Sequence, residues 1–145
     1  MTSPRARRAA PTDTLVFALL GTAGAVEARL EAALSPVGLS LAKAGVLHCL
    51  AQAQGPLPLS ELAMHEKCVR SNITQLMDRL ESDGLVRRRA DPDDRRSVRA
   101  ALTPAGRRAY ARAMRALAAE QRAILSHISE ADAATLKSAL QVLAR

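Results

Sequence analysis

Residues 83–106 of this 145-residue chain read DGLVRRRADPDDRRSVRAALTPAG. Its second residue, Gly84, is a typical left-handed helix stop, and strand-like residues follow near 85–89 and 97–102 around an arginine-rich turn. It closes on Thr103-Pro104, which predicts a new helix with Thr as its N-cap and Pro at its first position. Six arginines lie in this one hairpin, which is too small to form a core by itself. The hairpin therefore predicts a surface that reaches a polyanion.

The second strand of the hairpin has an alternating pattern. Val98, Ala100 and Leu102 occupy every other position, so we expect one buried face and one solvated face. Three acidic residues lie in the turn: Asp91, Asp93 and Asp94. One interpretation is a solvated turn in which these carboxylates pair with the arginines. The other is contact with nucleic acid, and both hold if the acids orient some arginines and leave others projecting.

Two helices are predicted just before the hairpin, near residues 60–67 and 69–83. The second has an apolar stripe for the core: Ile73, Leu76, Met77 and Leu80. Its other face is polar and carries Arg70, Ser71, Asn72, Thr74, Gln75, Asp78 and Arg79. Asn and Gln can pair with adenine and Arg with guanine, while Ser and Thr can bond phosphates or base edges. Two helices followed by a two-stranded wing are the parts of a winged helix-turn-helix, whose second helix enters the major groove.

The rest of the chain predicts further helices and a mainly α fold with a small β wing. A first helix over residues 13–34 ends before Pro36, and another begins after Ser40, a good N-cap. A fifth helix runs from 104 to about 127, and a sixth begins after Ser129. Ala and Leu dominate the apolar residues, and aromatic residues are almost absent. The length suits one domain. Twenty-one Lys and Arg against fourteen Asp and Glu give a net charge of +7, which implies nucleic acid or an anionic membrane as partner.

Other function classes find little support. The basic N-terminus followed by apolar residues 15–20 imitates a signal peptide, but the helical spacing continues through Glu27 and Arg29, so we interpret it as a helix. No segment is apolar and long enough to cross a bilayer. Cys49 and Cys68 form no disulfide framework, which fits a reducing, cytoplasmic location. The three histidines are dispersed, so we expect no metal and no cofactor, and no nucleophile is paired with a base, so we expect no enzyme.

The segment from Leu57 to Gly106 resembles the MarR family of bacterial transcription regulators. The linked motifs are Leu-Ser-Glu-Leu-Ala at 59–63, Asp-Arg-Leu-Glu at 78–81, Gly-Leu-Val-x-Arg at 84–88, Asp-Pro-x-Asp-Arg-Arg at 91–96 and Leu-Thr-x-x-Gly at 102–106. Flanking helices fit the family in number and order, so the resemblance extends over nearly the whole chain. It departs at Glu66, Lys67, Cys68 and Val69, where the family has an apolar residue, Gly, an apolar residue and a capping Ser or Thr. Because Val69 cannot cap a helix, the start of the recognition helix is left open.

The resemblance implies a homodimeric repressor that binds a near-palindromic operator and is released by a small molecule or an oxidant. Apolar residues at both ends of the chain independently favour dimerisation. We expect a basic flexible tail over 1–12, dimerisation helices over 13–35 and 104–145, and a DNA-binding lobe over 36–103. The expected DNA contacts are Arg70, Ser71, Asn72, Thr74, Gln75, Arg79, Arg88, Arg95, Arg96 and Arg99, with Arg95 and Arg96 in the minor groove and 70–75 in the major groove. The effector, a small aromatic or phenolic molecule, would bind between the lobe and the dimerisation helices.

Several alternatives stay open. Cys68 is either a small buried hydrophobe or a thiol sensor, activated by a helix N-terminus and by its neighbours Lys67 and Arg70. The family's peroxide sensors carry a cysteine near the start of helix one, and this chain has none there. Phe17 and Tyr110 either pack or line an effector pocket, and packing is the simpler expectation. The alternative function is an architectural protein that binds DNA with little regard for sequence, which predicts similar affinity for all duplexes.

Overall fold

A computed structural model describes residues 14–64, 73–94 and 96–144. Within these ranges the chain forms six α-helices, one 3-10 turn and a three-stranded antiparallel sheet, which confirms the predicted mainly α fold with a small β wing. The elements in chain order are α1 (Leu15–Leu34), η1 (Ser35–Val37), α2 (Leu41–Gln52), β1 (Leu57–Pro58), α3 (Leu59–Met64), α4 (Ile73–Ser82), β2 (Val86–Ala90), β3 (Val98–Leu102), α5 (Pro104–Leu125) and α6 (Glu130–Leu143).

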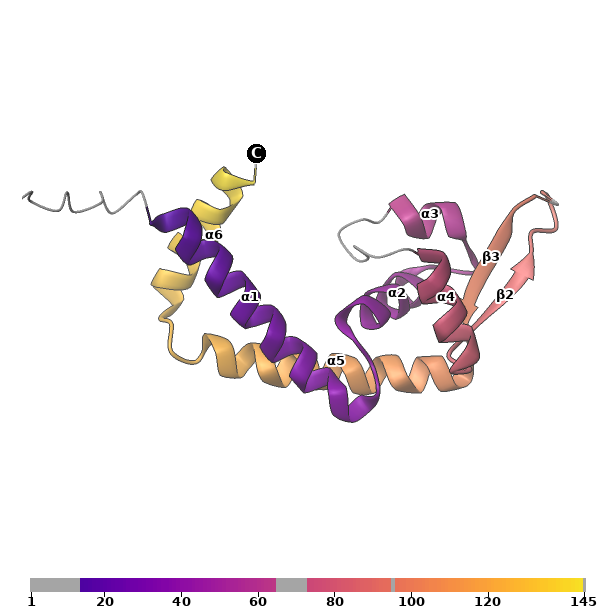
Figure 1. Ribbon diagram of the computed structural model, residues 1–145, viewed down its shortest axis with the longest axis horizontal. Helices are drawn as coiled ribbons and strands as arrows, with labels where there is room; N and C mark the ends of the chain where they lie inside the picture. Colours follow the sequence, from indigo (N-terminus) through magenta and orange to yellow (C-terminus); the bar gives the residue numbers. More distant parts are fainter. Residues whose placement is uncertain (1–13, 65–72, 95, 145) are drawn as a thin grey trace, which may run out of the picture.

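The molecule has two ends connected by α5. Figure 1 shows α2, α3, α4 and the sheet gathered over the N-terminal part of α5, while α6 and the first turns of α1 lie at its other end. Helix α1 descends from that end to meet α5 and then turns into α2 through η1. A long helix therefore supports both the lobe with the hairpin and the end where α1 and α6 lie.

The predicted helix starts are confirmed by side-chain caps. The Ser40 hydroxyl accepts a hydrogen bond from the Lys43 amide at 3.2 Å, and the Thr103 hydroxyl accepts one from Gly106 at 3.0 Å. The Ser129 hydroxyl accepts one from Asp132 at 3.1 Å. Each such cap stabilises its helix by about 1 kcal/mol because it satisfies an amide that has no intrahelical partner.

The sheet differs from the prediction in two ways. Strand β3 lies between β1 and β2, and the two-residue β1 was not predicted, since a strand that short and ending in proline has no readable periodicity. Ala100 and Leu102 are buried as predicted, but the expectation for Val98 was wrong, because 39% of it is exposed. Val98 pairs with Ala90 at the outer end of the hairpin, beyond the reach of the core.

The core fills the lobe between the helices and the sheet. Its largest fully buried side chains are Leu34, Val46, Leu47, Leu62, Met77 and Leu80, which come from α1, α2, α3 and α4. Cys49 is also buried, as predicted for a cysteine within the second helix. This core fixes α4 against α2 and the sheet, so the polar face of α4 has a firm support.

Candidate DNA-binding interface

Helix α4 has a sharp division between a packed face and a polar face. Leu76, Met77 and Leu80 are buried and Ile73 is half-buried, which confirms the predicted inward stripe. The opposite face is exposed and carries Thr74, Gln75, Asp78 and Arg79. These side chains offer a hydroxyl, an amide and a guanidinium at neighbouring positions of one helix, a set that can bond base edges and phosphates.

The first part of the predicted recognition helix lies outside the described residues. Arg70, Ser71 and Asn72 belong to this group, as does the candidate sensor Cys68. Among the predicted contacts on this helix, the structure therefore places Thr74, Gln75 and Arg79. Their roles in DNA contact stay predictions.

The end of α4 is locked to the hairpin that follows. Gly84 has a φ of 71°, the left-handed conformation that was predicted for the helix stop. The Leu85 amide donates to the Leu80 carbonyl at 2.9 Å, and the Gly84 amide donates to Glu81 at 2.9 Å. This closing turn directs the chain at once into β2, so the hairpin keeps a fixed orientation relative to α4. We call the hairpin formed by residues 86–102 the wing.

The turn of the wing is shaped by its aspartates, as predicted. One oxygen of Asp91 accepts from the Asp93 amide at 3.0 Å, and the other accepts from Arg99 Nε at 2.6 Å. Asp94 accepts from the amide of Arg96 at 2.9 Å. The hydrogen bond from Arg99, followed by that from the Asp93 amide, lowers the pKa of Asp91, and the same pairing raises the pKa of Arg99. Asp91 is only 6% exposed, so the Asp91–Arg99 pair forms part of the wing itself.

A second arginine of the wing is bound to α4. The Arg88 guanidinium donates to the carboxylate of Asp78, and its Nε lies 3.6 Å from Glu81 Oε2. The Arg88 amide donates to Glu81 Oε1 at 3.0 Å. Arg88 therefore joins β2 to the exposed side of α4, and it is half-buried where the sequence predicted a DNA contact. That pairing orients the polar face of α4 relative to the wing.

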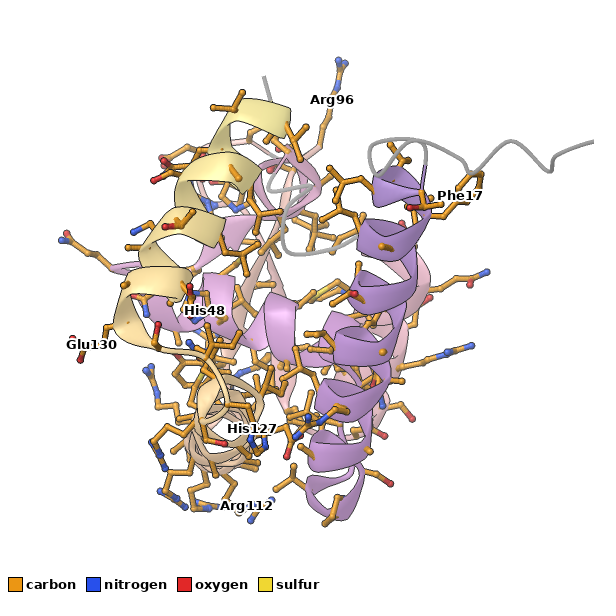
Figure 2. The ribbon with its side chains drawn as sticks, turned by 90° about the vertical axis from the view of Figure 1, so that its left-hand side faces the viewer. Phe17, His48, Arg96, Arg112, His127 and Glu130 are labelled. Carbon is orange, nitrogen blue, oxygen red and sulfur yellow. The ribbon has the colours of Figure 1, made fainter. Side chains whose placement is uncertain are left out.

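Other arginines of the wing project without a carboxylate partner among the described residues. Arg96 is exposed at the turn, and Figure 2 shows its side chain pointing out at the top of the molecule. Arg87 and Arg89 are exposed on β2, on either side of Arg88, and were not among the predicted contacts. The period of two along a strand could have identified them, since they share the face opposite Arg88. Arg95, the neighbour of Arg96 in the prediction, lies outside the described residues.

A polar pair joins α2 of the lobe to α5. His48 Nδ1 is 3.0 Å from the Tyr110 hydroxyl, and both residues are half-buried. Tyr110 thus packs within the fold, as expected. Phe17 is 76% exposed, so the expectation that it packs is not met within the single chain.

The described residues offer neither a metal-binding cluster nor a single membrane-spanning helix. No group of three or more His, Cys, Asp or Glu side chains there is arranged to hold a metal ion. No single helix there is long and apolar enough to span a membrane, and Leu15–Val37 meets that test only jointly with Leu41–Gln52, across a bend of 74°.

Comparisons with known proteins agree with this geometry. The model of the MarR family matches residues 39–98. The HTH-type transcriptional repressor Rv2887 of Mycobacterium tuberculosis is 33% identical over 126 residues, which cover 86% of this chain and 90% of that protein. The repressor CouR, solved with a 23-mer DNA duplex, is 27% identical with a TM-score of 0.83, covering 97% of this chain and 99% of that one. CouR from Rhodococcus jostii RHA1 bound to p-coumaroyl-CoA is 29% identical with a TM-score of 0.76, covering 94% and 95%.

Proposed function

Since the chain belongs to the MarR family and is a DNA-binding transcription regulator, we propose that it acts in the cytoplasm as a homodimeric repressor of a near-palindromic operator, released by a small molecule. The observation that carries this proposal is the fixed relative orientation of two exposed surfaces, one polar and one basic. The exposed face of α4 and the free Arg96 of the wing are held in one orientation by the Gly84 turn and by Arg88. One surface suits the major groove and the other suits a flanking minor groove.

The test is a selection of bound sequences from random duplex DNA, followed by titration of single mismatches. Direct readout by α4 predicts that each mismatch in the selected site weakens binding by about 1–3 kcal/mol, or about 5- to 150-fold. An architectural protein would instead bind selected and random duplexes with similar affinity at the same salt concentration. Equal affinity across all duplexes would contradict the proposed operator recognition.

The proposed dimer uses the end of the molecule formed by α1 and α6. Within the dimerisation helices of residues 13–35 and 104–145, α1 and α6 would make the two-fold contact, and residues 36–103 would form the DNA-binding lobe. Support comes from the large apolar side chains that the single chain leaves exposed at this end, such as Phe17 and Leu143, which are 76% and 62% exposed. A two-fold axis through this end would set two copies of α4 about one duplex turn apart, near 34 Å.

We propose a small aromatic or phenolic effector that binds among α1, α2 and α5. One line of support is the half-buried His48–Tyr110 pair, which supplies two polar groups among apolar side chains. The other is the similar structure of CouR, which was solved with p-coumaroyl-CoA bound. An effector that prefers the conformation unable to bind DNA would shift the population towards it. Release of a labelled operator by phenolic acids or their thioesters, screened at rising concentration, tests this assignment. Operator binding that none of them changes would contradict it.

An oxidant is the alternative releasing agent, and it would act on Cys68, which lies outside the described residues. A thiolate is the form that peroxide attacks, and neighbouring cations favour it. Mass spectrometry after mild peroxide treatment should then find a modified Cys68 together with weaker operator binding. An unmodified Cys68 with intact binding would exclude the thiol sensor.

A further inference from the structure

Helix α5 carries a row of arginines that the operator-binding surface does not use. We call this row the α5 stripe, and its members are Arg107, Arg108, Arg112, Arg115 and Arg122, all exposed. The opposite face of the helix packs on the lobe through Gly106, Ala109 and Ala113, which are buried. At 100° per residue the five arginines fall within one side of the helix, so they form a single basic face.

The stability of the helix does not account for the α5 stripe. Among the described residues, the one ion pair of α5 joins Glu120 to Arg29, and Glu120 is not on the exposed basic face. Arg108, Arg112 and Arg115 follow one another at spacings of four and three residues, where like charges destabilise a helix. A solvated helix face usually mixes acids with bases to avoid this repulsion, so a one-sign row indicates an acidic partner.

The α5 stripe faces away from the operator-binding surface. Figure 2 shows Arg112 projecting at the bottom of the molecule, while Arg96 of the wing projects at the top. In Figure 1, α5 lies below the lobe and the wing rises on its upper side. A duplex that contacts Arg96 therefore lies on the opposite side of the molecule from Arg112, so a separate molecule or a distant segment is the natural partner of the α5 stripe.

We propose that the α5 stripe binds the phosphate backbone of a second DNA duplex, so that the protein bridges two DNA segments. The row from Arg108 to Arg122 is straight and extends about 21 Å, the rise of fourteen helical residues. A duplex carries about one negative charge per 1.7 Å of its axis, so a straight row of guanidinium groups meets many phosphates at once. This interaction uses charge alone and requires no particular base sequence.

The residues between the arginines favour DNA over other acidic partners. The exposed positions between them are occupied by Ala111, Ala119 and Gln121, which are small or polar. A protein interface normally has an aromatic or large apolar anchor at its centre. No exposed residue between Arg107 and Arg122 is of that kind, and the exposed Leu125 lies beyond Arg122, at the end of the helix. A helix that lies on a membrane needs a large apolar side beside its basic one, and the apolar side of α5 is already packed on the lobe.

The inference rests on the proposed function, and a two-colour capture experiment separates the two. An immobilised operator duplex with one dye is saturated with the full-length protein, and a second duplex with random sequence and another dye is added. The test variant replaces three arginines together, Arg108→Gln, Arg112→Gln and Arg115→Gln. The charge-preserving variant replaces the same three with Lys and is the matched control, because it keeps the charge of the α5 stripe and changes the same positions.

Wild-type protein and the Lys variant should capture the second duplex, while the Gln variant should retain the first duplex and lose the second. The slope of log affinity against log salt for the second duplex should fall by about 2.7, or about 0.9 for each charge removed. Circular dichroism verifies that the Gln variant is folded. Undiminished capture by the Gln variant, or no capture by wild-type protein that holds its operator, would overturn the proposal. Wild-type protein that fails to hold even the first duplex would contradict the proposed function itself and remove the basis of bridging.

Discussion

At the scale of single residues, the arginines of the wing belong to two groups. Arg88 and Arg99 direct their guanidinium groups to carboxylates of the same chain, Arg88 to α4 and Arg99 to the turn. Arg96 has no carboxylate partner among the described residues, and Asp94 binds its backbone amide instead. The sequence shows the same residue type at all three positions. Their different surroundings predict different responses to mutation.

Replacing Arg96 with Ala should weaken operator binding and lower the salt slope by about one, because one phosphate contact and its released counterion are lost. Fluorescence anisotropy of a labelled operator at several salt concentrations measures both quantities. The matched variant is Arg88→Gln, which removes a charge that is already paired with Asp78. It should lower the free energy of unfolding and change the salt slope less than Arg96→Ala. Equal changes in slope would contradict the division into two groups.

Asp91 predicts a pH dependence of stability. Its pKa is lowered in the folded chain, first by the hydrogen bond from Arg99, so its charged form stabilises the fold above the pKa of the unfolded chain, about 3.9. This contribution is lost as the pH falls through the lower folded pKa. The difference in unfolding free energy between wild type and Asp91→Asn should therefore be largest near neutral pH and shrink below about pH 4. Urea unfolding of both proteins near neutral pH and below about pH 4 measures this difference. A difference that does not depend on pH would contradict the pairing of Asp91 with Arg99.

At the scale of elements, local patterns in the sequence predicted more than long-range ones. The caps at Ser40 and Thr103 and the left-handed Gly84 depend on a few neighbouring residues, and all three are confirmed. The link from Arg88 to Asp78 joins residues ten positions apart on different elements, and nothing in the local pattern indicates it. Exposure of Val98 likewise depends on how far the wing extends beyond the core, which is set by the whole fold.

The close contact of α5 with Leu85, the residue just before the wing, gives a prediction about Gly106. A Cβ atom at this position would lie 1.9 Å from the Leu85 carbonyl oxygen, which is backbone and cannot rotate away. Gly106→Ala should therefore lower the free energy of unfolding by about 2 kcal/mol, although Ala favours a helix. Urea unfolding followed by circular dichroism measures the change.

The matched control for Gly106 is Gly21→Ala on α1, where an added Cβ meets no atom within 4 Å. This variant should raise the free energy of unfolding by about 1 kcal/mol, because Ala is the better helix former. If both variants stabilise the protein, the close approach of α5 to Leu85 is not tight.

At the scale of the whole molecule, two groups of exposed apolar side chains lie at the end formed by α1 and α6. On α1 they are Leu15, Val16, Phe17 and Leu20, and on α6 they are Leu136, Leu140, Val142 and Leu143. Light scattering at micromolar concentration should give about twice the 15.4 kDa mass of the chain. Phe17→Asp combined with Leu140→Asp should give the mass of one chain and weaken operator binding, because the two lobes are no longer connected. A wild-type monomer would contradict the dimer.

Met64→Asp is the control for this mass measurement. Met64 is 77% exposed, but it lies on α3 in the lobe, far from the end formed by α1 and α6. The mass should stay that of the dimer, since this methionine takes no part in the proposed contact. A monomeric Met64→Asp protein would indicate that the loss of mass reflects misfolding and not a broken interface.

Helix α5 has the length and the attachments of a lever. Its 22 residues are about 33 Å long, and Gly106 fastens one end tightly beneath the wing while the other end continues into α6. A rigid rod of this length converts a tilt of about 5° at one end into a displacement of about 3 Å at the other, close to the rise of one base pair. In the proposed dimer, a ligand that changed this angle slightly would therefore move the two copies of α4 away from the spacing that the operator requires.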